Sequence, residues 1–151
     1  MTDYFDKKYI YEQSALLPYQ IRNGHFEILI ITTRNSKKWT IPKGLIEDNL
    51  TPAESAVQEG YEEAGIKGLI SPKTIGEYRY QKWAGICNVK VYPFEIKQVM
   101  AEWPESYFRK RKWIRLDEVQ NYISIAELQK IILSLPRFFG NSESAPQDFI
   151  N

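Results

Sequence analysis

The segment from Thr51 to Ala64 constrains the fold most, because it reads as a helix with both of its ends marked in the sequence. Thr51 and Glu54 have the spacing of a capping box, Pro52 suits the first helical turn, and Gly65 can end the helix. Small or apolar side chains recur at helical spacing and predict the face that packs on the core: Ala53, Ala56, Val57, Gly60, Tyr61 and Ala64.

Strand-forming residues dominate much of the remaining chain. The runs Ala15–Arg22 and Phe26–Thr32 are separated by Asn23-Gly24, which favours a tight turn, so these two strands should pair antiparallel. Residues 33–50 form a predicted long loop, and long loops in compact domains are usually functional. The other predicted strands are Trp39–Ile41, Thr74–Trp83, Ile86–Ile96 and Tyr107–Arg115.

A second amphipathic helix is predicted near the end of the chain. Ser124 and Glu127 have capping-box spacing, and Pro136 lies just beyond the expected helix end. The helix should cover one face of the sheet through its apolar positions, which are Ile125, Leu128, Ile131, Ile132 and Leu135.

The bulk properties indicate one small domain over residues 1–151, with an N-terminal arm (1–13) and a tail (140–151) that are loosely ordered. The 20 basic and 19 acidic residues give no overall attraction to nucleic acid, so general nucleic-acid binding is not expected. The single cysteine, Cys87, excludes an intrachain disulfide, and its alternation with Val89 and Val91 predicts a buried core position. Neither a signal peptide nor a membrane span is recognised, which predicts a cytoplasmic protein.

Three glutamates on the first helix carry the main chemical signal. Glu59, Glu62 and Glu63 lie at i, i+3 and i+4, so their carboxylates should converge on the face turned away from the core. Like charges at this spacing repel unless a cation lies between them, and hard oxygen ligands suit Mg²⁺ or Mn²⁺. A solvated acidic face is the simpler interpretation of the three glutamates alone. Gly60, within the helix, costs roughly 1 kcal/mol relative to alanine, which indicates close packing against a strand.

The stretch GLIEDNLTPAESAVQEGYEEAGI (Gly44 to Ile66) resembles the Nudix box, G-x5-E-x7-R-E-U-x-E-E-x-G-U, where U is aliphatic. The preceding WTIPKG is also similar to the family's entry into the box. Three positions depart from the pattern, namely Leu50 for the first glutamate, Gln58 for the arginine and Gly60 for an aliphatic residue. In the family, the glutamate and the arginine at the first two of these positions form an ion pair that braces the loop against the helix. The matching positions are Gly44, Glu59, Glu62, Glu63, Gly65 and Ile66.

The resemblance implies an α/β Nudix fold, a mixed curved β-sheet sandwiched between helices. It also implies a Mg²⁺-dependent hydrolase, with Mn²⁺ as a substitute, that cleaves a phosphoanhydride bond in a small nucleoside- or inositol-linked polyphosphate. Glu59, Glu62 and Glu63 would be catalytic and, with Gly44, would bind the metal. The chain looks most like the branch of diphosphoinositol polyphosphate and diadenosine polyphosphate hydrolases. The alternatives are a pyrophosphohydrolase for RNA 5′ ends, nucleoside triphosphates or nucleotide sugars, and a non-catalytic nucleotide-sensing domain.

Candidate substrate-binding residues lie in the loop before the helix. Arg34, Lys43 and the Gly44 turn can face the phosphates, although an ordinary basic surface loop would look the same. Trp39 can stack on a base or pack on the core. The RKRK run at 109–112 should place two charges on each face of a strand, either as a solvated edge or in contact with polyphosphate.

Overall fold

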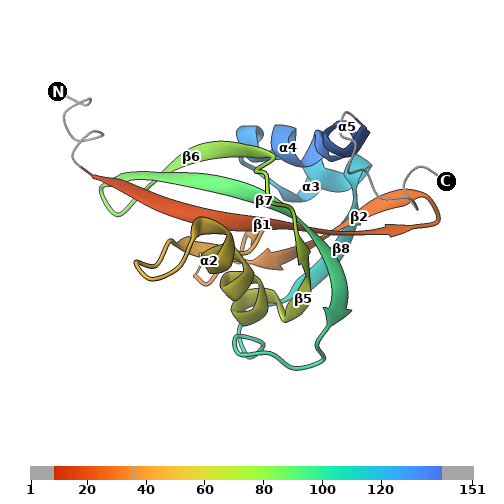
Figure 1. Cartoon of the computed structure of the whole chain (residues 1–151), viewed down its shortest axis with the longest axis horizontal. Coiled ribbons are helices and arrows are strands. Elements are labelled where there is room, and N and C mark those ends of the chain that lie inside the picture. The colour runs from red at the N-terminus through yellow and green to blue at the C-terminus, as the bar shows by residue number, and fades with distance from the viewer. Residues whose placement is uncertain (1–8, 36, 141–151) are drawn as a thin grey trace.

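A long mixed β-sheet runs through the molecule in the computed structural model, which describes residues 9–35 and 37–140 (Figure 1). The strands are β1 (Ile10–Arg22), β2 (His25–Thr32), β3 (Trp39–Thr40), β4 (Lys43–Leu45), β5 (Ile66–Ile70), β6 (Gly76–Lys82), β7 (Gly85–Val99) and β8 (Arg111–Arg115).

Strand β1 organises the sheet. It pairs in parallel with β7, from Ile10 opposite Ile86 to Tyr19 opposite Glu95, and antiparallel with β2 and β4. The hydrogen-bonded order is β3-β2-β1-β7-β5, while β4, β6 and β8 pair with β1, β7 and β2 respectively. The hairpin predicted at Asn23-Gly24 is confirmed, and both residues have positive φ.

Helices cover both faces of this sheet, as Figure 1 shows. One face carries α2 (Pro52–Glu59), which continues into the π-helical turn η1 (Gly60–Ala64). The other face carries η2 (Leu116–Glu118), α3 (Val119–Tyr122), α4 (Ala126–Leu133) and α5 (Leu135–Gly140). The predicted sandwich of a mixed sheet between helices is therefore confirmed.

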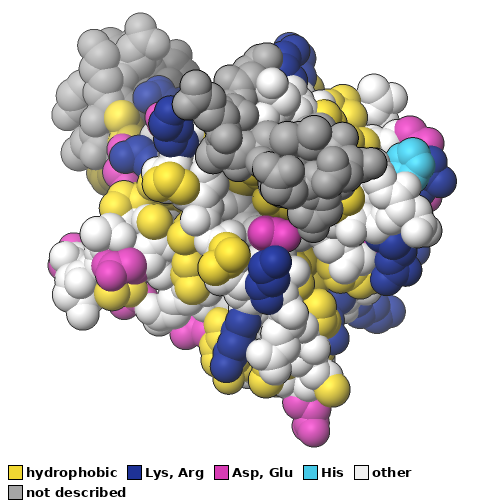
Figure 2. Space-filling view, turned by 45° about the vertical axis from the view of Figure 1, so that its right-hand side comes forward, with side chains coloured by type: hydrophobic (Ala, Val, Ile, Leu, Met, Phe, Trp, Pro, Cys, Tyr) yellow, Lys and Arg dark blue, Asp and Glu magenta, His cyan; other side chains and the backbone are white. Residues whose placement is uncertain are grey.

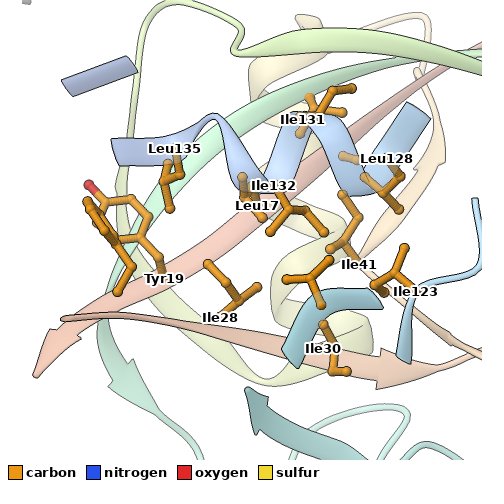
Figure 3. Close-up of a cluster of buried hydrophobic side chains, with 14 of the residues drawn as sticks. Leu17, Tyr19, Ile28, Ile30, Ile41, Ile123, Leu128, Ile131, Ile132 and Leu135 are labelled. Atoms are coloured by element: carbon orange, nitrogen blue, oxygen red, sulfur yellow. The ribbon is translucent and has the colours of Figure 1, made fainter. Parts of the chain in front are cut away.

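The core is divided between these two faces because successive strand residues point in opposite directions. In β1, Leu17 faces the α4 side and Leu16 faces the α2 side, and both are fully buried. Figure 3 shows Leu17, Ile28 and Ile30 of the sheet lying below α4. A strand that is buried on both faces appears in the sequence as a continuous apolar run, as in the ILII of β2.

Several strand predictions need correction. Strand β1 begins at Ile10, so residues 10–13 of the predicted arm belong to the sheet, paired with β7. Strand β5 was not predicted, because it is short, polar in its middle and irregular in its pairing at Lys67/Gly68. The strand expected over Tyr107–Arg115 covers only Arg111–Arg115. Residues 1–8 and 141–151, most of the predicted arm and tail, lie outside the described residues.

The C-terminal helix is also shorter than predicted. Its N-cap is Ile125 and no side chain caps it, so the Ser124–Glu127 capping box was wrong. The helix ends at Ser134, whose hydroxyl donates to the carbonyl of Ile131 at 2.7 Å. Pro136 therefore lies within α5, where a proline is tolerated in the first turn. Burial of the α4 core positions is confirmed for Leu128, Ile131 and Ile132.

The helix α2 begins as predicted, with a complete capping box between Thr51 and Glu54. Its buried face is rotated relative to the prediction, because Val57 and Tyr61 are 37% and 40% exposed. Gly60 fixes this orientation, since a Cβ there would collide with the Leu16 side chain. The expected close approach of Gly60 to a strand is therefore confirmed, and the same rotation turns the Glu63 side of the helix inward.

Candidate active site

Two of the three helix glutamates, Glu59 and Glu63, lie side by side at the turn between α2 and η1. Glu63 is 8% exposed, and its Oε1 accepts a hydrogen bond from the backbone N–H of Lys43 at 3.1 Å. Its Oε2 lies 3.3 Å from an Nη atom of Arg109. Glu59 packs against Gly44, where a Cβ would collide with the Glu59 carboxylate. The absence of a side chain at Gly44 is thus what lets the loop approach the helix.

Burial makes this pair difficult to ionise. Desolvation, followed by repulsion from Glu63, raises the pKa of Glu59 from its ordinary value of 4.5 to about 8, and the charges of Glu62 and Glu105 raise it further. Burial also raises the pKa of Glu63, although the Arg109 charge opposes this shift. In the absence of metal, Glu59 therefore keeps its proton at neutral pH and donates it to Glu63 in a hydrogen bond.

Glu62 is placed differently from the other two glutamates. Its carboxylate accepts a hydrogen bond from the Gln58 side chain at 3.3 Å. In the described part of the chain, no three His, Cys, Asp or Glu side chains are arranged together as a metal-binding group. The structure thus brings Glu59 and Glu63 together with Gly44, and leaves Glu62 bonded along the helix.

The chemistry of the pair nevertheless fits a divalent cation. A buried carboxyl pair that retains a proton has oxygens available to a hard cation, which would displace that proton. Glu62 and Glu105 lie near enough to raise the pKa of Glu59, so further carboxylate oxygens are close at hand. Glu105 was not identified from the sequence, because it lies in the loop 100–110, far along the chain from the helix.

A pocket of about 400 Å³ lies near the pair, and neither Glu59 nor Glu63 is among its lining residues. Lys43 joins the two, because its side chain lines the pocket while its backbone N–H holds Glu63. Burial lowers the pKa of Lys43, whose ammonium lies 5.3 Å from the centre of the Tyr80 ring. The cations of the lining are Arg34, Lys38, Lys43 and Lys82, and its larger apolar side chains are Trp39, Tyr80, Ile123, Ile125 and Leu128. No Asp or Glu is among the described residues of the lining.

Both predicted substrate-binding cations, Arg34 and Lys43, therefore line the same pocket. Arg34 is held there by Phe108, whose ring centre lies 4.4 Å from its guanidinium carbon. Lys37, three residues further along the same loop, donates to the Phe108 carbonyl at 3.0 Å. Trp39 also lines the pocket and contacts Tyr122 edge to face, so its position allows both of the roles considered from the sequence.

The RKRK run divides as its alternation predicted. Lys110 and Lys112 are exposed, whereas Arg109 and Arg111 point into the protein. Arg111 donates to the carbonyls of Ala64 and Met100, at 2.9 Å each. The interpretation of this run as a solvated strand edge is therefore correct only for Lys110 and Lys112. On the face drawn in Figure 2, the Lys and Arg side chains form separate small groups with acidic residues among them, not a continuous basic stripe.

The loop 100–110 packs over the C-terminal end of η1. Trp103 donates from its indole N–H to the Glu63 carbonyl at 2.9 Å, and the backbone N–H of Glu105 donates to the Glu62 carbonyl at 3.1 Å. The Arg111 guanidinium stacks on Trp103 at 3.7 Å. These contacts satisfy carbonyls that the end of a helix leaves without partners. They also fix the turn that carries Glu63.

The departures at Leu50 and Gln58 leave the loop braced in other ways. The backbone N–H of Glu47 donates to the Ser55 hydroxyl at 3.1 Å, which ties the loop to the first turns of α2. The Gln58 side chain instead donates a hydrogen bond to the Glu62 carboxylate on the same helix.

Cys87 is fully buried, which confirms its predicted core position.

Comparison with known proteins defines the family of the chain. Residues 14–134 match the NUDIX domain family, so the chain belongs to it. It is 26% identical over 132 residues to Nudix hydrolase 13, mitochondrial, of Arabidopsis thaliana, covering 81% of this chain and 65% of that protein. It is also 26% identical to mouse diphosphoinositol polyphosphate phosphohydrolase 2 over 119 residues, covering 78% and 65%.

The fold is similar to that of the Caenorhabditis elegans Ap4A hydrolase, with a TM-score of 0.74 at 20% identity, covering 86% of this chain and 98% of that structure. The chain spans about half to two thirds of the length of the curated relatives it matches. No helix within residues 9–35 and 37–140 is long and apolar enough to cross a membrane. A cytoplasmic location stays a prediction from the sequence, since the Arabidopsis relative is named as mitochondrial.

Proposed function

We propose that this chain is a magnesium-dependent hydrolase that cleaves a phosphoanhydride bond in a nucleoside-linked polyphosphate. The observation that carries the proposal is the buried Glu59–Glu63 pair, joined through Lys43 to a pocket that is rich in cations. Water forms a new P–O bond at one phosphorus while the bond from that phosphorus to the bridging oxygen breaks. The other product leaves with the bridging oxygen.

Nudix hydrolases generally use divalent metals, and we assign the ligands here to Glu59 and Glu63. Glu62 and the Gly44 turn complete the proposed set, and Mn²⁺ is expected to replace Mg²⁺. When bound, the cation neutralises phosphate charge, orients the diphosphate and lowers the pKa of bound water. Glu63 provides a fixed carboxylate because both of its oxygens are already held by the protein.

The cations of the pocket hold the phosphates in this proposal. Arg34 offers a planar guanidinium already oriented by Phe108, and Lys43 offers an ammonium close to Glu63. Because the described lining has no acidic side chain, a polyanion meets no like charge there.

The apolar half of the pocket favours a nucleoside over an inositol. Trp39 and Ile125, both partly exposed, offer an aromatic and an aliphatic surface beside the cations. A nucleobase has a planar face that can stack on such a surface, whereas a phosphorylated inositol ring carries charged groups around its whole edge. Of the two substrate classes suggested by the sequence, the nucleoside-linked polyphosphates match both halves of the pocket.

Replacing the phosphate-binding cations should affect long phosphate chains most. We expect Arg34→Ala and Lys43→Ala each to lower kcat/KM by about ten- to a hundredfold for a tetraphosphate, the worth of a charge-assisted hydrogen bond, and by less for a diphosphate. Steady-state kinetics on a series of increasing phosphate number measures this. The exposed Lys73→Ala is the matched control and should behave as wild type. An equal fall for every chain length would remove Arg34 and Lys43 from the phosphate site.

Loss of the aromatic surface should affect only substrates that carry a base. We expect Trp39→Ala to raise KM about tenfold for dinucleoside polyphosphates, in line with the free energy of base stacking, and to leave inorganic tripolyphosphate unaffected. Trp83→Ala is the control, since Trp83 is 50% exposed in the β6–β7 turn and does not line the pocket. If Trp39→Ala changed both substrates equally, Trp39 would have a structural role instead.

A substrate panel tests the proposed function directly. Purified protein with Mg²⁺ is offered dinucleoside polyphosphates, inositol pyrophosphates, nucleoside triphosphates, triphosphorylated RNA and nucleotide sugars, and the products are separated by anion exchange. We expect the fastest turnover for dinucleoside polyphosphates. Faster cleavage of inositol pyrophosphates would overturn the substrate assignment, and nucleotide binding without any turnover would identify a sensing domain.

A further inference from the structure

We propose that Arg109 is a positioning residue that fixes the Glu63 carboxylate in the orientation needed to bind the cation. This inference rests on the proposed function, because it assigns Glu63 as a metal ligand. It gives a role to one residue of the basic run at 109–112 that the sequence did not connect with the helix.

The contact between Arg109 and Glu63 is close and shielded from water. An Nη atom of Arg109 lies 3.3 Å from Oε2 of Glu63, and the two side chains are 10% and 11% exposed. The other carboxylate oxygen, Oε1, is held by the Lys43 N–H. The two oxygens of Glu63 are therefore held by two different segments of the chain, Oε1 by the Lys43 loop and Oε2 by the loop 100–110. Each oxygen still has a lone pair available for a cation.

Arg109 is itself held by contacts that do not involve Glu63. Its Nε lies 2.6 Å from Oε1 of Glu105, and its other Nη atom donates to the Thr32 carbonyl at 2.8 Å. Its guanidinium carbon lies 5.1 Å from the centre of the Phe108 ring. All three nitrogens are thus engaged, and the orientation of the group toward Glu63 is set by the end of β2 and by the loop 100–110.

This arrangement needs a guanidinium and not merely a positive charge. A lysine ammonium carries its three N–H donors on one nitrogen, so it cannot reach the three acceptors that Arg109 meets through three separate nitrogens. Gln58, at the position of the family's arginine, is neutral and bonds Glu62. The cation that orients the most buried glutamate therefore comes from a distant loop.

The expected consequence is a loss in metal affinity and kcat, with little change in KM. Without Arg109, the Glu63 carboxylate keeps only the Lys43 N–H and the hydrogen bond from Glu59. A cation that displaces the Glu59 proton removes the second of these, so the carboxylate can then rotate. Partners that orient a metal ligand typically contribute 10- to 100-fold to metal affinity or activity. A simple stabilising ion pair would instead lower Tm and leave metal affinity unchanged in the folded protein. A cation that merely repelled the metal would give tighter binding when removed.

Calorimetric titration with Mn²⁺, together with kcat and KM for a dinucleoside tetraphosphate, tests the proposal. The proteins are wild type, Arg109→Gln, Arg109→Lys and the neighbouring exposed control Lys110→Gln. We expect Mn²⁺ Kd to rise and kcat to fall about 10- to 100-fold in Arg109→Gln. Arg109→Lys should recover Tm but not kcat, and Lys110→Gln should match wild type. If Arg109→Gln fails to fold, the Arg109→Lys variant carries the test.

The outcomes separate this inference from the proposed function. Wild-type Mn²⁺ affinity and kcat in a folded Arg109 variant, or tighter Mn²⁺ binding, would overturn the positioning role while leaving the hydrolase intact. Weakened Mn²⁺ binding in Arg109→Gln, combined with no hydrolysis by wild type, would support the positioning role and overturn the function. Failure of the wild type to bind Mn²⁺ would overturn both.

Discussion

Glu63→Gln is expected to lower kcat/KM by about a hundredfold or more while the protein stays folded, which is at least the effect of losing a residue that merely supports a ligand. Glu63 is the most buried of the three helix glutamates, and both of its oxygens are held in place. The amide preserves its shape and can still accept the Lys43 N–H, but it removes the charge that attracts the cation. Steady-state kinetics with saturating Mg²⁺ measures the loss, and circular dichroism checks the fold.

The comparison with neighbouring glutamates sharpens this test. Glu62→Gln should have a smaller effect, because the Glu62 carboxylate is less buried than that of Glu63 and is bonded to Gln58. Glu127→Gln, on the exposed side of α4, makes the same charge change on the opposite face of the sheet and should not alter turnover. Near wild-type kinetics in Glu63→Gln would refute its assignment as a ligand. Equal losses in all three variants would point to a general charge effect.

The second large effect concerns pH, and it belongs to the metal-free protein. The pKa of Glu59 is about 8 in the folded state and 4.5 ordinarily, so between these values the native state holds a proton that the unfolded state has released. The stabilisation is fully present below pH 4.5 and is lost as pH rises through 8. The free energy of unfolding should therefore fall with rising pH, by at most about 1.4 kcal/mol per pH unit because one proton is lost, and over a range that is shortened because water partly screens Glu59.

Melting curves in EDTA from pH 5 to pH 8.5, for wild type and Glu59→Gln, isolate this contribution. The wild-type Tm should fall by several degrees more across this range than that of Glu59→Gln, which cannot lose the proton. Mg²⁺ should raise the wild-type Tm more at pH 8 than at pH 6, because the cation competes with the proton for the same oxygens. Parallel Tm profiles for the two proteins in EDTA would show that Glu59 titrates normally.

The features predicted best from the sequence are those set by local chemistry. The capping box at Thr51, the helix end at Gly65 and the hairpin at Asn23-Gly24 each depend on a few adjacent residues, and the structure confirms all three. The contact between Glu59 and Glu63 likewise follows from their i, i+4 spacing on a helix.

The features missed by the sequence depend on partners far along the chain. Nothing local to Arg109 indicates Glu63 as its partner, because the loop 100–110 and the helix become neighbours only through the pairing of β5 with β7 and of β2 with β8. The burial of Glu63 likewise depends on the contact of Gly60 with Leu16, which turns the helix relative to its apolar pattern. The Ser124 cap failed because a favourable local motif did not coincide with the helix start that packing selected.

The most direct test of the central claim is hydrolysis of a dinucleoside tetraphosphate in ¹⁸O-labelled water by wild type and the Glu59→Gln/Glu63→Gln double variant. Products are separated and their phosphates examined by mass spectrometry. The account predicts cleavage by wild type that requires Mg²⁺ and stops with EDTA, one ¹⁸O in one of the two products, and no measurable cleavage by the double variant. Intact substrate with wild type in both Mg²⁺ and Mn²⁺, or equal cleavage by the double variant, would contradict it.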